Sequence, residues 1–219
     1  MTQQNHTENT HYMIEGQIRP NAVNDEKILA AIASVNRVDY TPRHLKNVAF
    51  ADQDIVLENN RIMPSALLLS RMLKMADAQK TDIALMIGDS TGYSSAVISR
   101  MVEAVVSLED NEQCSDDCSK TLEEHSVDNV ATLTGDMALG NKKQGPYDII
   151  FINGGVEQLP QELIDQLSDN GRLVCVWNEG PVGHGRLIHK QGDMITSKDF
   201  FETSVPVIPC FALEKEFEF

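Results

Sequence analysis

The sequence predicts an α/β protein built on a doubly wound, mostly parallel sheet. From residue 83 onward, short apolar runs alternate with helical segments, beginning with residues 83–87, 104–108 and 130–133. These runs are mostly apolar and do not alternate with polar residues, and a strand of that kind is buried on both faces, as in a parallel sheet covered by helices. With 219 residues the chain corresponds to about one domain. We expect one structural unit, in which residues 1–76 form an N-terminal arm and helical region and residues 77–219 form the sheet domain.

Two helices are predicted before the sheet. Asn24 or Asp25 can cap the first, which presents an apolar face made of Ile28, Leu29, Ile32 and Val35. The second covers residues 66–75 and has a wide apolar stripe. Residues 1–11 are polar and aperiodic, so we expect them to form a loose arm.

The pattern continues to the end of the chain. Helices are predicted near residues 93–101, from the second apolar run through His125, and near 160–167. Further strands are predicted at residues 148–152 and 172–177. After residue 177 the helical signals stop, and residues 186–189 and 205–217 are typical of two antiparallel strands joined by glycine-rich turns.

The charge balance disfavours two classes of partner. The chain has 18 Lys and Arg residues against 33 Asp and Glu residues, a net charge of −15. Such a charge repels the phosphate backbone of nucleic acids and anionic lipid headgroups. Aromatic residues make up only 5%, which leaves few platforms for stacking bases. We therefore expect no nucleic-acid partner and no membrane partner.

The cysteines indicate a reducing compartment. Cys114, Cys118, Cys175 and Cys210 are too few and too irregularly spaced for a disulfide framework. No second His or Cys pair completes a zinc set, so no metal site is expected. No stretch approaches the roughly 18 apolar residues of a membrane span, and the N-terminus lacks a signal-peptide pattern. We expect a soluble, cytoplasmic protein.

Two loops at the carboxyl ends of the predicted strands favour a nucleoside ligand. In a doubly wound sheet, ligands bind beyond those ends, where the strand order reverses. The first loop is Gly88, Asp89, Ser90, Thr91 and Gly92, in which glycines let the backbone approach a ligand. Glu109 ends the next strand, where an acid can accept both hydroxyls of a ribose. At this point an adenosine site and a purely structural turn both stay open.

Two further loops belong to the same expected crevice. Gly135 and Asp136 follow the third apolar run, and the acid there can meet an adenine amino group. Asn153 follows the fourth run and is itself followed by two glycines. We therefore expect Gly135, Asp136 and Asn153 to line the crevice together with the first loop and Glu109.

Eight segments carry a resemblance to a known family. They are residues 13–20, 28–42 and 49–52 in the N-terminal third, and residues 87–96, 135–136, 146–150, 159–160 and 170–174 in the sheet domain. In order and spacing they resemble the protein-L-isoaspartate O-methyltransferases over nearly all of the chain. Many methyltransferases share the shorter patterns, but the combined set is specific.

The resemblance implies a fold, a cofactor and a reaction. The fold is the Rossmann-like fold of S-adenosylmethionine-dependent methyltransferases, with an N-terminal helical extension and C-terminal antiparallel strands. The cofactor is S-adenosylmethionine, with Gly88, Asp89, Ser90, Gly92, Glu109, Gly135, Asp136 and Asn153 as its binding residues. The substrate is a protein or peptide that bears an isoaspartyl residue, whose carboxylate is methylated.

The chain departs from the family pattern at three places. Met86 stands where the family has an acid, and Ser90 stands where it has a glycine, whose missing Cβ allows close approach. The family's Thr-Ile-Ser, with its serine beside the reacting carboxylate, is replaced in the segment from Arg61 to Ser65. Pro64 has no N–H donor, and the sequence leaves open whether Ser65 replaces the missing serine.

These departures limit what the sequence assigns. The loop lacks features that favour the cofactor, so we expect weak methyltransferase activity and assign no catalytic residue. We expect Ser90→Gly to tighten cofactor binding and the addition of Met86→Asp to tighten it further. The alternative is an inactive protein of the same fold that acts as a binding or regulatory module. The oligomeric state cannot be predicted.

Overall fold

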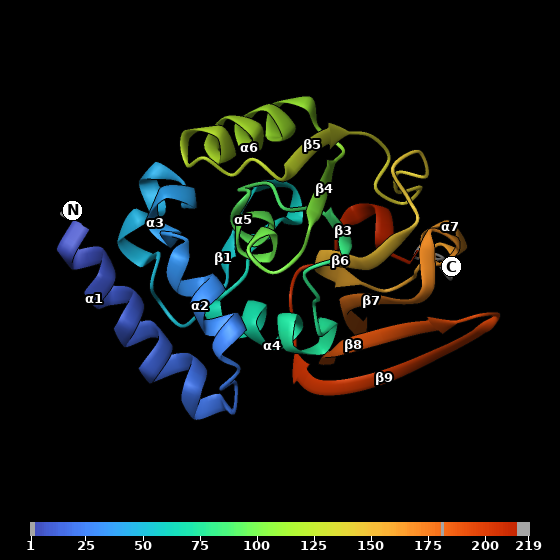
Figure 1. Ribbon diagram of the computed structural model, residues 1–219, viewed down its shortest axis with the longest axis horizontal. Coiled ribbons are helices and arrows are strands. Elements are labelled where there is room, and N and C mark those ends of the chain that lie inside the picture. The colour runs from blue at the N-terminus through green and yellow to red at the C-terminus, as the bar shows by residue number, and fades with distance from the viewer. Residues whose placement is uncertain (1–2, 181, 214–219) are drawn as a thin grey trace, which may run out of the picture.

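A seven-stranded sheet forms the centre of the computed structural model, which describes residues 3–180 and 182–213 (Figure 1). The strand order is β5-β4-β3-β6-β7-β8-β9. The first five strands in this order run parallel, and β8 and β9 are antiparallel. The strands are β3 (Ile83–Ile87), β4 (Ala104–Glu109), β5 (Val130–Thr134), β6 (Tyr147–Val156), β7 (Leu167–Glu179), β8 (Val182–Gln191) and β9 (Met194–Thr203). The predicted doubly wound sheet is confirmed.

Helices cover both faces of this sheet. The N-terminal elements are α1 (Gln3–Met13), η1 (Ile14–Ile18), η2 (Arg19–Asn21), α2 (Glu26–Ser34), α3 (Arg37–Tyr40), η3 (Arg43–Val48), β1 (Ile55–Val56), η4 (Glu58–Asn60), β2 (Ile62–Met63) and α4 (Ala66–Ala76). The later ones are α5 (Tyr93–Ser99), α6 (Glu112–Glu124), α7 (Gln161–Asp165) and η5 (Pro209–Phe211). None of the described helices is long and apolar enough to cross a membrane.

The apolar strand residues supply two cores, one on each face. On β3, Ala84 and Met86 point into the core shared with α2, α4 and α5, whereas Leu85 and Ile87 point into the core that contains α7 and Phe211. Alternate residues of one strand are thus buried on opposite faces, which is why the run shows no polar alternation. The N-terminal helices share the first core with the sheet. The division at residue 76 stays a prediction.

The two predicted N-terminal helices are confirmed. Asp25 caps α2, since its side chain accepts a hydrogen bond from the backbone N–H of Lys27 at 2.8 Å. The predicted apolar face of α2 is buried. Helix α4 extends one residue beyond the predicted 66–75, and its apolar stripe packs against the sheet.

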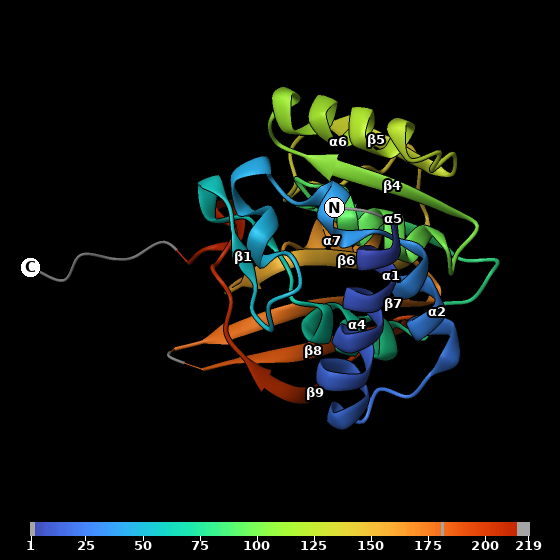
Figure 2. The ribbon, with the colours of Figure 1, turned by 90° about the vertical axis from the view of Figure 1, so that its left-hand side faces the viewer.

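The loose arm predicted for residues 1–11 is wrong over its described part, which is helical. Helix α1 has no strongly apolar face, so its periodicity gives no signal. It runs directly into η1, and the two anchoring side chains at this end, Thr10 and Met13, are buried. In Figure 2 the helix lies along the side of the molecule, next to α2. Tertiary contact at one end therefore orders a segment that is polar along most of its length.

The strand predicted at residues 205–217 is also wrong. The strand that follows β8 and pairs with it in antiparallel fashion is β9. Its residues are mostly exposed, so its sequence lacks the alternation of apolar and polar residues that predicts a strand. The chain after β9 instead turns back over the end of β6, where Gly155 and Val207 form an isolated parallel bridge. Pro206 and Pro209 oppose a regular strand there. Residues 214–217 of that prediction lie outside the described part of the chain.

The return of residues 205–208 over β6 depends on a missing side chain. A Cβ at Gly155 would lie 2.9 Å from the backbone oxygens of both Val205 and Pro206. We expect Gly155→Ala to lower the free energy of unfolding by about 1–3 kcal/mol in urea denaturation, because backbone has to move. Gly16→Ala is the control, since a Cβ there meets nothing within 4 Å. Equal stability of the two variants would contradict this prediction.

Candidate functional site

The predicted loops meet at the carboxyl ends of β3 and β4. The backbone N–H of Gly88 donates to the carbonyl of Leu108 at 3.1 Å, and that of Gly135 donates to the carbonyl of Glu109 at 2.8 Å. These bonds continue the pairing of the parallel strands, so the ends of three neighbouring strands form one edge. The strand order reverses beside this edge, because the chain leaves β5 and returns on the other side of β3.

The first loop is shaped by two glycines. Gly88 and Gly92 have φ values of +81° and +78°, a region that favours glycine. Between them, Asp89 is completely buried, and its carboxylate accepts a hydrogen bond from the backbone N–H of Ser95 at 2.6 Å. Burial raises the pKa of Asp89, while its hydrogen bonds at the start of α5 oppose the shift. The carboxylate of Asp89 therefore holds the first loop on α5.

The position of Asp89 changes what we expect of the substitution Met86→Asp. The side chain of Met86 lies in the apolar core and is completely buried. A carboxylate already serves the loop, three residues further along the chain. Met86→Asp would bury a second acid among apolar side chains, where a charge is costly. We therefore no longer expect the addition of Met86→Asp to Ser90→Gly to tighten ligand binding further.

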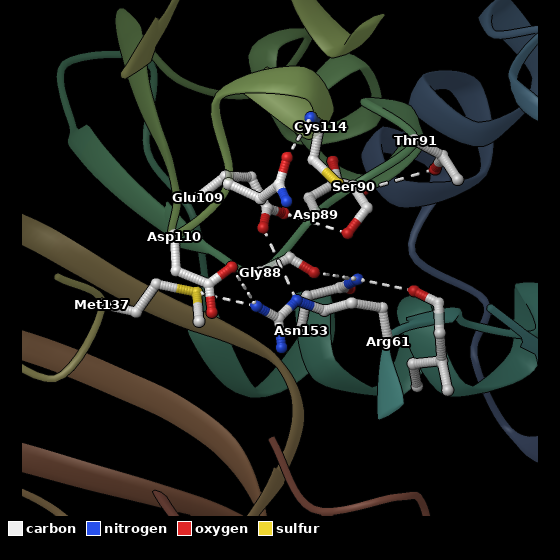
Figure 3. A network of polar contacts seen from close by, with 12 residues as sticks. Arg61, Gly88, Asp89, Ser90, Thr91, Glu109, Asp110, Cys114, Met137 and Asn153 are labelled. Atoms are coloured by element: carbon white, nitrogen blue, oxygen red, sulfur yellow. Dashed lines mark hydrogen bonds and ion pairs between the residues drawn. The ribbon is translucent and has the colours of Figure 1, made fainter. Parts of the chain in front are cut away.

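Glu109 ends β4 and lies among the polar side chains next to the first loop (Figure 3). It is 1% exposed, and one of its carboxylate oxygens accepts a hydrogen bond from the Ser90 hydroxyl at 3.2 Å. Burial raises the pKa of Glu109 from 4.5 to about 7, although the neighbouring Arg61 opposes the shift. The Ser90 side chain, which the sequence suggests as an obstruction, thus contacts the acid directly.

Arg61 is the site residue that sequence reasoning missed. It is 3% exposed, and its Nε lies 3.5 Å from Oε2 of Glu109. Its Nη2 donates to Asp110 at 2.9 Å and lies 3.5 Å from the sulfur of Met137. Arg61 follows the tight turn of η4 and precedes the two buried residues of β2. A charged residue directly before two buried apolar residues is the one feature of the sequence that could have indicated a buried arginine here.

This polar cluster is incompletely satisfied. Among the described residues, Nε and Nη1 of Arg61 and Oε2 of Glu109 are buried without a hydrogen-bond partner. Buried polar atoms are normally paired with protein, water or ligand. The crevice therefore offers an acceptor oxygen and two donor nitrogens to a polar molecule.

The remaining predicted residues divide into two groups. Asn153 is buried, and its amide is fully used: it donates to the carbonyls of Ile62 and Gly88 and accepts from Ser94. Asn153 lies within β6 and not in a loop after the strand, and it joins β6 to β2, α5 and the first loop. Asp136 is exposed beside Gly135, and its side chain accepts from the backbone N–H of Ala138 at 2.9 Å. Asp136 is therefore exposed just after β5, and its contact with an adenine stays a prediction.

Ser65 has a structural role. It is the N-cap of α4, and its hydroxyl oxygen accepts a hydrogen bond from the backbone N–H of Leu68 at 3.2 Å. Its own backbone N–H donates to Asp54. Met63, two residues earlier, is completely buried in the apolar core. The hydroxyl of Ser65 is thus committed to α4 and does not reach the crevice.

A cleft of about 490 Å³ lies beside the cluster. One wall comes from residues 42–59 and the other from the start of α6, with Arg61 and Ser90 at the base. The polar side chains on its walls are His44, Glu58, Asn59, Asp110, Asn111, Gln113 and Cys114. Within residues 3–180 and 182–213, the cleft included, no group of three His, Cys, Asp or Glu side chains is placed to hold a metal ion.

The fold and this crevice define a class of protein, the Rossmann-like methyltransferases. In that class a glycine loop follows the first parallel strand and an acid ends the second. The family model for protein-L-isoaspartate(D-aspartate) O-methyltransferase matches residues 8–209. The chain belongs to this family.

Individual relatives agree with the family match. A protein-L-isoaspartate O-methyltransferase of Protochlamydia amoebophila (strain UWE25) is 30% identical over 171 residues, covering 78% of this chain and 79% of the relative. One of Aliivibrio fischeri (strain MJ11) is 27% identical over 197 residues, covering 90% of this chain and 94% of the relative.

Two solved structures share the fold. A protein-L-isoaspartate O-methyltransferase superposes with a TM-score of 0.79 at 23% identity, and the match covers 92% of this chain and 65% of that one. A Plasmodium falciparum protein assigned to the same family, solved with S-adenosyl-L-homocysteine, has a TM-score of 0.75 at 17% identity, covering 94% of this chain and 98% of the other.

The raised pKa of Glu109 predicts a pH effect on stability. Between pH 4.5 and about 7 the folded chain holds a proton on Glu109 that the unfolded chain has lost, so this group's contribution to stability falls as the pH rises. We expect the unfolding free energy of the unaltered chain to fall, relative to Glu109→Gln, by roughly 3 kcal/mol across this window. Urea denaturation at several pH values measures it, with Glu162→Gln on α7 as control. Parallel curves for the unaltered chain and Glu109→Gln would refute the assignment.

The capping role of Ser65 predicts a cost in stability. We expect Ser65→Ala to lower the free energy of unfolding by about 1 kcal/mol, because the N–H of Leu68 loses its acceptor. Ser65→Thr keeps a hydroxyl at the cap and is the matched control. Urea denaturation of both variants tests the role, and a fully stable Ser65→Ala would contradict it.

Proposed function

We propose that this chain is an S-adenosylmethionine-dependent methyltransferase that methylates isoaspartyl carboxylates in proteins, and that it works more slowly than relatives with the complete motif. The family match over residues 8–209 carries this proposal, together with Glu109 placed beside the glycine loop. We place the protein in the cytoplasm, where its four free cysteines would remain thiols. Its partners are isoaspartyl-containing proteins or peptides, and its charge of −15 argues against nucleic acid.

The residues of the crevice fit this cofactor in kind. Oε2 of Glu109 is buried and lacks a donor, and a ribose hydroxyl would supply one. Gly88 and Gly92 have positive φ values, and a Cβ on either would meet protein side chains, Ile208 at 3.0 Å and Cys118 at 3.1 Å, so these glycines would serve the cofactor by giving the loop its shape. Asp136 at the rim would accept an adenine amino group. Asp89, Ser90, Gly135 and Asn153 would contribute through the loops that they form or brace. One side chain, Arg61, stands beside Glu109 where the ligand would lie.

The reaction demands little acid–base chemistry from the chain. The cofactor supplies an activated methyl group, and the acceptor carboxylate is already a nucleophile. The residues of the chain therefore bind and orient, and the cleft beside Ser90 has room to admit a peptide end. Orientation of this kind can supply much of a rate enhancement.

The slow rate follows from what is missing at the acceptor side. Met63 has no hydroxyl group, and its side chain is buried in the apolar core. The hydroxyl of Ser65 caps α4. A misplacement of the acceptor by about 1 Å can cost roughly 100-fold in rate. Loss of the orienting group therefore slows transfer without removing the ability to bind the cofactor.

A second candidate function is a binding or regulatory module without catalysis. Two observations favour it: the buried guanidinium of Arg61 in the crevice and the commitment of Ser65 to helix capping. Such a protein would keep the scaffold and lose turnover.

Calorimetry and a methyl-transfer assay test the two candidates. We expect S-adenosylmethionine to bind and an isoaspartyl peptide to be methylated slowly. We expect Glu109→Ala to weaken cofactor binding by about 1–3 kcal/mol, because charge-assisted hydrogen bonds are lost. Glu162→Ala, an exposed acid on α7, is the control.

Three outcomes distinguish the candidates. Binding without any transfer supports the module. Turnover equal to that of the Aliivibrio fischeri relative contradicts the slow rate. An unchanged dissociation constant in a folded Glu109→Ala rules out the ribose role of Glu109.

A further inference from the structure

We propose that Arg61 is an internal occupant of the nucleoside crevice, which a ligand must displace from Glu109, and that this exchange makes the crevice favour an uncharged nucleoside thioether over its cationic sulfonium form. The inference rests on the proposed function, because it names what controls access to the same site.

The position of Arg61 carries the first step. Figure 3 shows its guanidinium between the first loop and the end of β4, facing Glu109 and Asp110. Its Nε lies 3.5 Å from Glu109, and it would lie 3.8 Å from a Cβ placed on Gly88. Ile208, whose Cδ1 would lie 3.0 Å from that Cβ, covers the glycine from one side. Arg61 thus fills the polar part of the space between the acid and the glycine, the two features that favour a nucleoside. A ligand using both cannot enter while the guanidinium stays there.

The contacts of Arg61 are weak for a buried arginine. One hydrogen bond, from Nη2, reaches Asp110, whose own side chain is 50% exposed. Nε and Nη1 have no acceptor, and the distance to Glu109 is too long for a well-formed hydrogen bond. A buried pair that is only partly satisfied returns little of its desolvation cost. Arg61 can therefore be exchanged for a ligand hydroxyl at modest cost.

The side chain also has a place to go. Arg61 lines the 490 Å³ cleft, and the carboxylates of Asp110 and Glu58 lie on the same walls. Its backbone is held on both sides, since its N–H donates to Glu58 at 3.1 Å and its carbonyl accepts from Leu57 at 2.8 Å. Rotation of the side chain into the cleft therefore needs no movement of β2.

The displaced charge sets the ligand preference. Arg61 stays attached to β2 and remains at the edge of the crevice after it moves. A second positive charge in a partly buried site is disfavoured. S-adenosylmethionine carries a sulfonium cation, whereas S-adenosylhomocysteine has a neutral sulfur. We expect the arginine to weaken binding of both and to penalise the cation more.

Calorimetric titration of Arg61 variants tests the proposal. The probes are S-adenosylhomocysteine and S-adenosylmethionine, at about pH 8 so that Glu109, with a pKa of about 7, is ionised. We expect Arg61→Met to tighten S-adenosylhomocysteine binding by roughly tenfold or more, because the occupied state no longer competes. The gain for S-adenosylmethionine is expected to be larger. Arg61→Lys should fall between Arg61→Met and the unaltered chain.

The control is Arg186→Met, which removes another paired arginine. Arg186 on β8 pairs with Asp199 on β9 at 2.6 Å, and three strands lie between β8 and β4. Its removal should leave both dissociation constants unchanged. Circular dichroism checks that each variant is folded, and a crystal structure of the unaltered chain with S-adenosylhomocysteine gives a measurement that needs no variant.

The outcomes separate this inference from the proposed function. Equal affinities of the unaltered chain and a folded Arg61→Met, or a ligand-bound structure with Arg61 still against Glu109, overturn the inference and leave the function standing. Equal gains for the two ligands overturn the charge preference. No binding by either protein at about 1 mM ligand overturns both the inference and the function.

Discussion

Burial of the parallel strands on both faces is the constraint on which the rest of the structure depends. Strands β3 and β6 carry apolar side chains in alternating directions, so helices must cover each face. Parallel strands joined by those helices bring their carboxyl ends to one edge of the sheet. The glycine loop after β3, the acid ending β4 and the turn after β5 therefore converge there without any attraction among the polar residues themselves. The crevice follows from how the sheet is covered.

The electrostatics of the crevice follow from the same burial. Glu109 is removed from water, and burial raises the pKa of its carboxyl group to about 7 even though Arg61 lies beside it. Two groups of opposite charge thus share a dry site without forming a well-made ion pair. Under the exchange that we propose, a polar ligand replaces the contact between Arg61 and Glu109 with its own contacts. Its affinity then depends on the cost of breaking the first contact as well as on the strength of the new ones.

Family membership and the details of the site carry different information. The match over residues 8–209 establishes descent and the fold. The acceptor side differs from the family pattern, because the segment from Arg61 to Ser65 now supplies an arginine to the crevice and a cap to α4. These two roles are compatible with each other, because Arg61 and Ser65 are the first and last residues of the five-residue segment. The same segment therefore lacks the family's serine and places Arg61 beside Glu109.

The sequence by itself determined the features that depend on local pattern. Mostly apolar runs predict β3 and β4, the capping residue Asp25 marks the start of α2, and the position of Glu109 after its strand places it in the crevice. Only the tertiary structure decided the features that join distant segments. Arg61 meets Asp110 across 49 residues, and Asn153 reaches Ile62 across 91. Neither contact has a periodic signature, because each depends on which helix covers which face of the sheet. The exposed β9 and the polar α1 escaped prediction for a related reason, since their order comes from neighbours and not from their own apolar pattern.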